Sequence, residues 1–187
     1  TPEDIHAAVP YIKRLCEAMR IPVLEVAGYE ADDVIGTLAH KAAAEGFEVF
    51  MVTPDKDYGQ LVTDRVKIYK QKGEGIEIVD REAIKEHYGF DDPILVRDVL
   101  ALWGDASDNI PGVQGIGEKG AIKLVNQFGT VEQILEHTDE LTPKQRANVE
   151  AGAEQLRLSK RLASIVLDVP IEFDAQALRV EQPDVDA

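Results

Sequence analysis

The sequence predicts an α/β domain, with a mainly parallel sheet flanked by helices, followed by an all-helical part. Residues 47–53, FEVFMVT, form an apolar run that is typical of a buried parallel strand, and residues 30–46 before them have helical spacing. Segments 66–70 and 75–79 alternate in polarity and predict a hairpin. Further along the chain, no strand pattern recurs until about residue 165. The two parts therefore join near residues 104–111.

The remaining segments divide into helices, one short strand and a tail. Apolar residues recur at helical spacing over 3–19, around Pro10, and PVLEV at 22–26 predicts a strand. Further helices are predicted at 80–88, 93–103, 116–128, 130–137 and 143–163. The proline-containing, acidic residues 170–187 predict a linker that leaves the domain. We thus expect three units, at 1–103, 104–167 and 168–187.

The composition indicates a cytoplasmic protein with an unevenly distributed charge. The formal net charge is −15 over 187 residues, but it is zero over residues 111–162. The sequence has no apolar run long enough to span a membrane, and its N-terminus resembles neither a signal nor a transit peptide. The single cysteine, Cys16, cannot form an internal disulfide, and we expect it in the core. The chain starts at Thr1 within a helical pattern, so we expect a fragment of a longer protein.

Three clusters of acidic residues stand at the ends of predicted elements. The first begins the helix at 30–46, the second follows the strand at 47–53, and the third closes the α/β part; the residues are Glu30, Asp32, Asp33, Asp55, Asp57, Asp105 and Asp108. Each cluster alone has a structural explanation: helix-dipole partners, a turn, or loop caps. Functional groups of open α/β sheets gather where the strands end, so all three clusters can converge on one crevice.

Seven carboxylates in one crevice would repel one another unless cations were bound between them. Mg²⁺ or Mn²⁺ suits such a set of oxygen ligands, and two such ions can hydrolyse a phosphodiester without a histidine base. Lys56 lies between two of the acids, where it can temper their charge, contact a phosphate, or remain exposed to solvent. A metal-dependent phosphodiesterase is therefore one prediction from the residues alone.

The stretch PGVQGIGEKGAIKLV, residues 111–125, predicts a grip on a nucleic-acid backbone. Its turn Gly115-Ile116-Gly117 precedes a helix that begins near Glu118, so backbone N–H groups can point at a phosphate. Lys119 and Lys123 share one face of that helix and can reach neighbouring phosphates. The pattern matches a helix–hairpin–helix. Five more basic residues can extend the surface or be neutralised by intervening acids: Lys144, Arg146, Arg157, Lys160 and Arg161.

These stretches together resemble the 5′ nuclease (flap endonuclease) family, and closely the 5′→3′ exonuclease domains of bacterial DNA polymerase I. The matching segments are GYEADDVIGTLA (28–39), TPDKDYGQLV (53–62), GDASDNIPGVQGIGEKGAIKLV (104–125) and FGTVEQIL (128–135). The resemblance implies a PIN-like α/β core, here N-terminally truncated, and a helix–hairpin–helix (H3TH) subdomain. It also implies hydrolysis of DNA at 5′ ends or flaps in replication and repair.

The resemblance also implies ligands and partners. The seven acids would be both metal-binding and catalytic, holding two or more Mg²⁺ or Mn²⁺ ions. Gly115, Ile116, Gly117, Lys119 and Lys123 would bind duplex DNA with a 5′ end or flap. A K⁺ ion would be held by the backbone carbonyls of Pro111, Val113 and Ile116. The remaining chain of a DNA polymerase I would be the covalent partner.

The sequence departs from the family pattern in two respects. The family's first strand, with its metal-binding aspartate, and its basic arch have no counterpart before Thr1. We therefore expect weak or no cleavage of a 5′-flap duplex by these 187 residues alone, and exposed apolar surface that favours dimers or marginal stability. Tyr58-Gly59 stands where the family has a leucine and a bulkier residue, with a local effect expected.

Two other functions are compatible with parts of the pattern. The chain could be a DNA-binding module whose acids only decorate the surface, and metal titration separates this from a nuclease. A receiver-like α/β domain also has acids at its strand ends, with Asp55 as the phosphoryl acceptor. Such a domain has no use for a helix–hairpin–helix.

Overall fold

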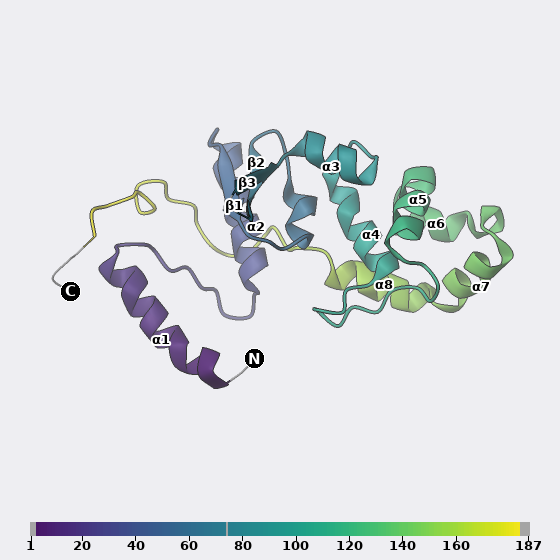
Figure 1. The fold of residues 1–187 in the computed structure, drawn as a ribbon, viewed down its shortest axis with the longest axis horizontal. Coiled ribbons are helices and arrows are strands. Elements are labelled where there is room, and N and C mark those ends of the chain that lie inside the picture. The colour runs from purple at the N-terminus through teal and green to yellow at the C-terminus, as the bar shows by residue number, and fades with distance from the viewer. Residues whose placement is uncertain (1–2, 74, 184–187) are drawn as a thin grey trace.

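The computed structural model describes residues 3–73 and 75–183, and it is an elongated molecule with an α/β part and a helical part (Figure 1). The first part contains α1 (Glu3–Ala18), α2 (Ala31–Ala44), β1 (Val49–Val52), the 3₁₀ helix η1 (Asp57–Leu61), β2 (Val66–Lys72), β3 (Gly75–Val79), α3 (Arg81–Tyr88), η2 (Pro93–Leu95) and α4 (Val96–Trp103). The second contains α5 (Glu118–Phe128), α6 (Val131–Glu136), η3 (Thr138–Glu140), α7 (Pro143–Ala151) and α8 (Ala153–Leu162). None of the helices in the described ranges is long and apolar enough to cross a membrane.

The sheet is mixed, in the order β1-β2-β3. β1 is parallel to β2, with Val49 opposite Val66, and β2 is antiparallel to β3, with Ile68 opposite Val79. The predicted hairpin is therefore confirmed. The expected mainly parallel sheet is wrong for the described strands, because one of the two pairings is antiparallel.

Two strand predictions need correction. Residues 22–26 are not a strand; they run without a ladder partner, and Val23 and Leu24 are exposed. Of the strand predicted at 47–53, only residues 49–52 (β1) form a strand. This strand is buried on one face only, since Met51 is 4% exposed and Val52 is 78% exposed. β1 is an edge strand of the described sheet, so only one of its edges is paired and much of its surface faces solvent.

Helix α4 is the centre of a core that continues through both parts. Its residues Val96, Val99, Leu100, Ala101 and Leu102 are at most 1% exposed. The helix packs against η1 and η2 on the α/β side and against α5 and α8 on the helical side. A single hydrophobic cluster joins residues of both parts, so the loop after α4 links two parts that share one core.

The helical part follows the predicted pattern with one break. α5 begins at Glu118 as expected, and Thr130 caps α6 by accepting a hydrogen bond from the N–H of Gln133. The single helix predicted at 143–163 is two helices, α7 and α8, which meet at Gly152. Gly152 has ψ of 10°, outside the helical range, and ends the regular geometry of α7.

Helix α1 lies apart from the sheet and from α4 (Figure 1). Its apolar residues Ile5, Tyr11, Ile12 and Leu15 are each more than half exposed. Cys16 is only half-buried, so its predicted place in the core is wrong. The helical spacing is correct, but no apolar surface of the described chain covers this face.

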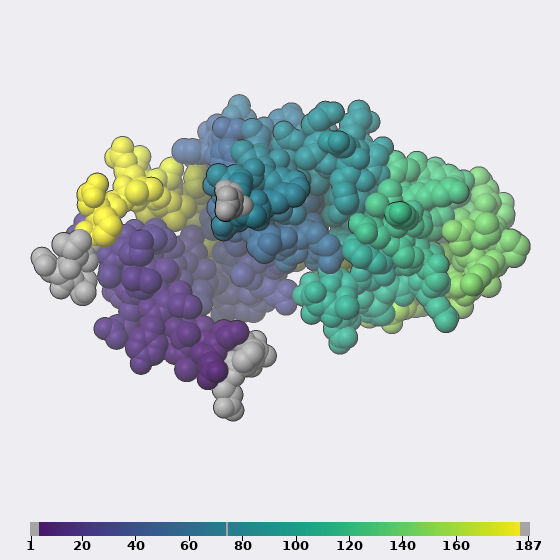
Figure 2. Space-filling view, in the orientation of Figure 1, coloured from purple at the N-terminus to yellow at the C-terminus, as the bar shows by residue number. Residues whose placement is uncertain are grey.

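The chain after α8 crosses α2 in an extended form. Val169 is 1% exposed, and Lys41 of α2 donates a hydrogen bond to the carbonyl of Ile171 at 2.5 Å. The tail then reaches the segment after α1, where Arg20 pairs with Glu181 at 3.2 Å, and Figure 2 shows these two ends of the chain on one side of the molecule. The start of the predicted linker is thus packed on the α/β part. Its last four residues, 184–187, lie outside the described residues.

Candidate metal centre

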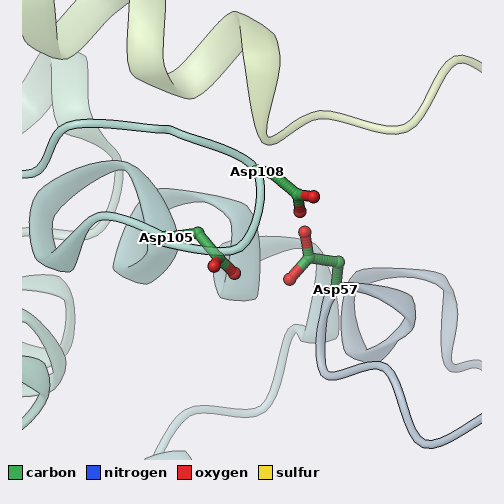
Figure 3. Close-up of side chains that lie close together, drawn as sticks. All are labelled: Asp57, Asp105 and Asp108. Atoms are coloured by element: carbon green, nitrogen blue, oxygen red, sulfur yellow. The ribbon is translucent and has the colours of Figure 1, made fainter. Parts of the chain in front are cut away.

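Three aspartates from two separate segments meet at the junction of the two parts (Figure 3). Asp57 is the first residue of η1, and Asp105 and Asp108 lie in the loop after α4. One carboxylate oxygen from each of the three lies within 4.8 Å of the other two. The convergence predicted for the second and third acidic clusters is therefore present.

A tight loop gives Asp105 and Asp108 their positions. The N–H and carbonyl of Asp105 both bond to Ile110 at 2.8 Å, which closes residues 105–110 into a small β-bridge. The base of this loop requires glycine. A Cβ added at Gly112 would lie 2.2 Å from the carbonyl oxygen of Trp103, and Gly104 has φ of 86°.

Asp57 is the most perturbed acid of the group. It is 7% exposed, and burial, followed by the charges of Asp55 and Asp105, raises its pKa to about 7. Its Oδ1 is buried and accepts no hydrogen bond from any described residue. Such an oxygen is expensive to keep ionised without a partner, and a bound cation would supply that partner.

Lys56 partly neutralises the charge of Asp105. Its Nζ donates to Oδ2 of Asp105 and lies 5.3 Å from the centre of the Trp103 ring. Burial would raise the pKa of Asp105, but the hydrogen bonds from Lys56 and from the N–H of Ser107 outweigh it and lower that pKa. Burial likewise would lower the pKa of Lys56, but the bond and charge of Asp105 raise it. Of the three possibilities for Lys56, the structure supports charge neutralisation.

The three aspartates are part of a larger acidic cleft of about 420 Å³, which has room for hydrated ions because a water occupies about 30 Å³. Five of the seven predicted acids line it: Glu30, Asp32, Asp55, Asp57 and Asp108. Burial and the charge of Asp33 raise the pKa of Asp32. Asp105 joins the group from the side, through its proximity to Asp57 and Asp108.

Asp33 is the one predicted acid that faces away from this group. Its Oδ1 accepts a hydrogen bond from the N–H of Val166 at 2.8 Å, and its Oδ2 accepts one from the N–H of Glu30 at 3.2 Å. Asp33 is not among the residues that line the cleft. Its contacts fix the first turn of α2 to the segment after α8.

The donor set of the cleft fits hard divalent cations. All the charged ligand candidates that line it are carboxylates, and Mg²⁺ and Mn²⁺ prefer oxygen ligands. The unpartnered Oδ1 of Asp57 points to the same conclusion. Asp57, Asp105 and Asp108 could hold one ion, with Glu30, Asp32 and Asp55 available for another.

The predicted hairpin lies on the helical side of the cleft. Gly115 has φ of 78°, and Gly117 is the N-cap of α5. Lys119 and Lys123 are exposed on α5, and neither is ion-paired with another described residue. The turn is thus arranged as the sequence predicts.

Two side chains that the sequence did not single out hold the hairpin loop. Ser159 is fully buried and donates to the carbonyl of Pro111 at 2.7 Å, and Asn148 donates to the carbonyl of Gln114 at 2.8 Å. The carbonyl of Val113 accepts the N–H of Ile116 at 3.0 Å. Ser159 and Asn148 are far from the loop in sequence, and no local pattern marks them.

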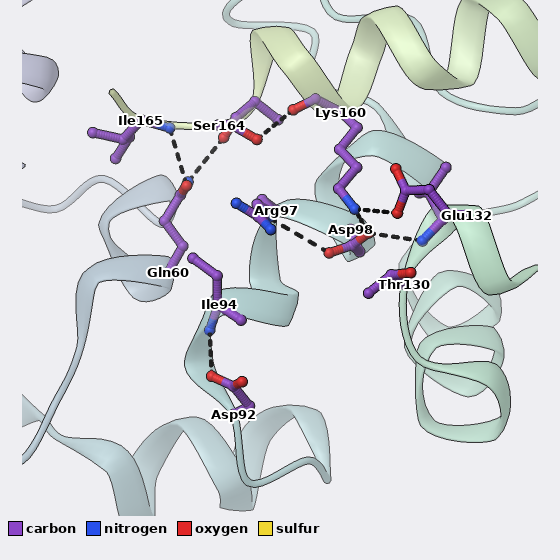
Figure 4. A network of polar contacts seen from close by, with 12 residues as sticks. Gln60, Asp92, Ile94, Arg97, Asp98, Thr130, Glu132, Lys160, Ser164 and Ile165 are labelled. Carbon is purple, nitrogen blue, oxygen red and sulfur yellow. Dashed lines mark hydrogen bonds and ion pairs between the residues drawn. The ribbon is translucent and has the colours of Figure 1, made fainter. Parts of the chain in front are cut away.

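The basic extension of this surface is partly neutralised. Arg146 pairs with Glu150 and Arg157 pairs with Glu154, both at 2.8 Å. Lys160 is largely buried, and its ammonium binds the fully buried Asp98 at 2.8 Å and Glu132 at 2.5 Å (Figure 4). Of the five basic residues named, Lys144 and Arg161 are in none of the ion pairs of the described residues.

Known proteins match this chain along nearly its whole length. Residues 1–89 match the family described as 5′-3′ exonuclease, N-terminal resolvase-like domain, and residues 92–186 match the 5′-3′ exonuclease, C-terminal SAM fold. The chain is 44% identical to the thermostable DNA polymerase I of Thermus filiformis over 187 residues, which cover 100% of this chain and 22% of that protein. It is 43% identical to the DNA polymerase I of Bacillus subtilis (strain 168), covering 97% of this chain and 21% of that protein.

Solved structures show the same arrangement. A flap endonuclease of bacteriophage T5, in a pseudo-enzyme–product complex with DNA and metal ions, has a TM-score of 0.76 at 25% identity, over 87% of this chain and 59% of that one. The catalytic core of Rad2 in complex with DNA substrate has a TM-score of 0.65 at 19% identity, over 98% of this chain and 62% of that one. The second likeness shows the fold alone.

An α/β core with an acidic cleft, joined through α4 to a helical hairpin subdomain, is a 5′ nuclease fold. The chain belongs to the 5′-3′ exonuclease family, and the resemblance inferred from its motifs is confirmed. It spans about a fifth of the length of the curated relatives it matches.

Proposed function

We propose that the chain is the metal-dependent catalytic and duplex-binding part of a structure-specific 5′ nuclease that hydrolyses DNA at 5′ ends or flaps. The observation that carries the proposal is the convergence of Asp57, Asp105 and Asp108 within 4.8 Å, with one buried carboxylate oxygen left without a partner. The flap endonuclease of bacteriophage T5, similar in fold, was solved with DNA and metal ions. The similarity of the present chain to DNA polymerase I of Thermus filiformis and Bacillus subtilis supports a place within a longer polymerase chain.

The residues of the cleft would bind the metal ions, and those of the hairpin would bind the DNA. Two or more divalent cations, when bound, supply activation of the attacking water and neutralisation of the charge that develops on the phosphate. Asp57, Asp105 and Asp108 provide oxygen ligands, and Lys56 keeps Asp105 ionised through its hydrogen bond. Glu30, Asp32 and Asp55 provide the remaining carboxylates of the cleft.

The hairpin would hold the duplex beside the cleft. The backbone N–H groups of Gly115 and Gly117, just before α5, can bind a phosphate, whereas the N–H of Ile116 is used within the turn by the carbonyl of Val113. Lys119 and Lys123 can contact the neighbouring phosphates. These contacts recognise the backbone and not the base sequence, which suits an enzyme that selects substrates by their shape.

A K⁺ ion at the hairpin is a further part of this proposal. The carbonyls of Pro111 and Val113 each accept one hydrogen bond, which leaves a second lone pair on each oxygen, and Ile116 would supply the third carbonyl. Such an ion would bridge the loop to a DNA phosphate.

The test is a Mn²⁺ titration followed by electron paramagnetic resonance, with DNA cleavage measured in the longer protein. Asp108→Asn and Asp57→Asn should weaken Mn²⁺ binding at least tenfold and abolish Mg²⁺-dependent cleavage of a 5′-flap duplex. Asp139→Asn, an exposed acid in η3, is the matched control and should change neither. If both cleft variants bind Mn²⁺ as tightly as the parent, the cleft is not a metal centre. The alternative, a DNA-binding module without a metal centre, would then be favoured.

A further inference from the structure

The buried side chain of Gln60 lies between two segments that border the metal cleft. Gln60 is in η1, three residues after Asp57, and is 5% exposed. Its Nε2 donates to the carbonyls of Asp57, at 3.0 Å, and Ala163, at 2.8 Å. Its Oε1 accepts the N–H of Ile165 at 3.0 Å (Figure 4). One amide thus uses both of its donors and its acceptor to join η1 to the chain that follows α8.

The segment that Gln60 holds also reaches the acids of α2. Val166 donates its N–H to Asp33 and accepts the hydroxyl of Thr37 at 3.3 Å. Asp33 in turn accepts the N–H of Glu30. Residues 163–166 therefore connect Gln60, on one side of the cleft, to the first turn of α2, on the other.

This connection fixes two groups of carboxylates relative to each other. Asp57 comes from η1, and Glu30 and Asp32 come from the start of α2, yet all three line the same cleft, beside Ala163. The strands place these elements only coarsely, whereas metal ligation requires positions correct to about 0.5 Å. A buried amide with three satisfied hydrogen bonds is rigid enough to supply that precision.

We propose that Gln60 is a positioning residue of the metal centre, which sets the backbone of Asp57 relative to Glu30 and Asp32. It touches no ligand oxygen of the cleft, so its effect passes through the carbonyl of Asp57 and through residues 163–166. This inference rests on the proposed function, because it assumes that the cleft binds divalent cations.

The experiment compares Gln60→Met with Ser164→Ala. Methionine nearly preserves the volume of Gln60 and removes all three hydrogen bonds. Ser164 is a matched control, since it lies in the same segment and its hydroxyl donates to the carbonyl of Lys160 at 2.6 Å, and not to η1 or α2. Mn²⁺ affinity is measured by calorimetric titration, and the melting temperature is measured separately without metal.

Gln60→Met should bind Mn²⁺ about tenfold more weakly, the lower range for loss of an outer-shell partner. Ser164→Ala should keep the parent's Mn²⁺ affinity, whatever its effect on the melting temperature. Gln60→Asn, which retains the amide but is one methylene shorter, should show a smaller loss of affinity and serves if the methionine variant does not fold.

Two results would overturn the inference while leaving the proposed function intact: unchanged Mn²⁺ affinity in the folded Gln60 variant, or an equal loss of affinity in Ser164→Ala. A parent chain that binds no Mn²⁺ would instead overturn the proposed function, and the role of Gln60 with it. The two failures are therefore distinguishable from one data set.

Discussion

The buried carboxylate of Asp57 makes the metal-free protein less stable at neutral pH, and Asp57→Asn should reverse this. In the unfolded chain Asp57 has the ordinary pKa of 3.8, whereas in the folded chain the pKa is about 7. The folded state therefore binds the proton more tightly. The resulting penalty is absent below pH 4, grows as the pH rises, and is complete above pH 7.

The size of the effect follows from the two pKa values. A difference of about 3 units, at 1.36 kcal/mol each, corresponds to an upper limit of about 4 kcal/mol at pH 8. Asparagine keeps the shape of the side chain but still buries an amide, so we expect Asp57→Asn to raise the free energy of unfolding by about 2 kcal/mol at pH 8. At pH 4 the charge penalty is nearly absent but the buried amide remains, so the variant should be less stable than the parent by about 2 kcal/mol.

The assay is urea unfolding in EDTA at several pH values from 4 to 8, with Asp139→Asn as the exposed control. Saturating Mn²⁺ should then stabilise the parent at pH 8 and stabilise Asp57→Asn far less. The reasoning is refuted if Asp57→Asn is no more stable than the parent at pH 8, or if its advantage is the same at pH 4.

Three further predictions concern the loop, the core network and the DNA surface. Gly112→Ala places a Cβ 2.2 Å from the carbonyl of Trp103 and should lower the free energy of unfolding by about 3 kcal/mol, measured by urea denaturation; a loss below 1 kcal/mol would contradict it. Lys160→Met removes the ammonium beside the fully buried Asp98 and should cost about 3 kcal/mol by the same assay. The double variant with Asp98→Asn should recover part of it, because asparagine is uncharged and keeps an acceptor for the N–H of Val131. Lys119→Gln with Lys123→Gln should weaken duplex binding uniformly across sequences and lower the slope of log affinity against log salt by about 2, measured by fluorescence anisotropy; an unchanged slope would exclude these lysines from the interface.

The acids of the cleft could be predicted because their positions follow from local rules. Asp57 follows a strand and Glu30 and Asp32 start a helix, and both kinds of position border the same end of an α/β sheet. The turn at Gly115–Gly117 has a local signature as well. The structure adds that Asp33 accepts the N–H of Val166 and that Asp105, paired with Lys56, does not line the cleft itself.

The predictions that failed required knowledge of a neighbour. The apolar stripe of α1 predicts a helix correctly, but the same stripe cannot say whether a surface covers it, so Cys16 was wrongly expected in the core. Residues 22–26 have strand-like composition and lack a strand to pair with. Gln60, Ser159 and Asn148 were missed for the same reason, since apart from the bond of Gln60 to Asp57 their hydrogen-bond partners lie 34 to 105 residues away.

Those long-range bonds show how one helix couples the two sites. Within five residues near the end of α8, Ser159 holds the hairpin loop at Pro111, Lys160 holds α4 at Asp98, and Ala163 holds η1 through Gln60. A duplex bound at the hairpin would therefore be placed relative to the metal cleft by the end of α8 as well as by the loop that joins the parts in sequence. If the chain acts as proposed, these contacts would fix the distance between the phosphate bound at the hairpin and the one bound at the cleft.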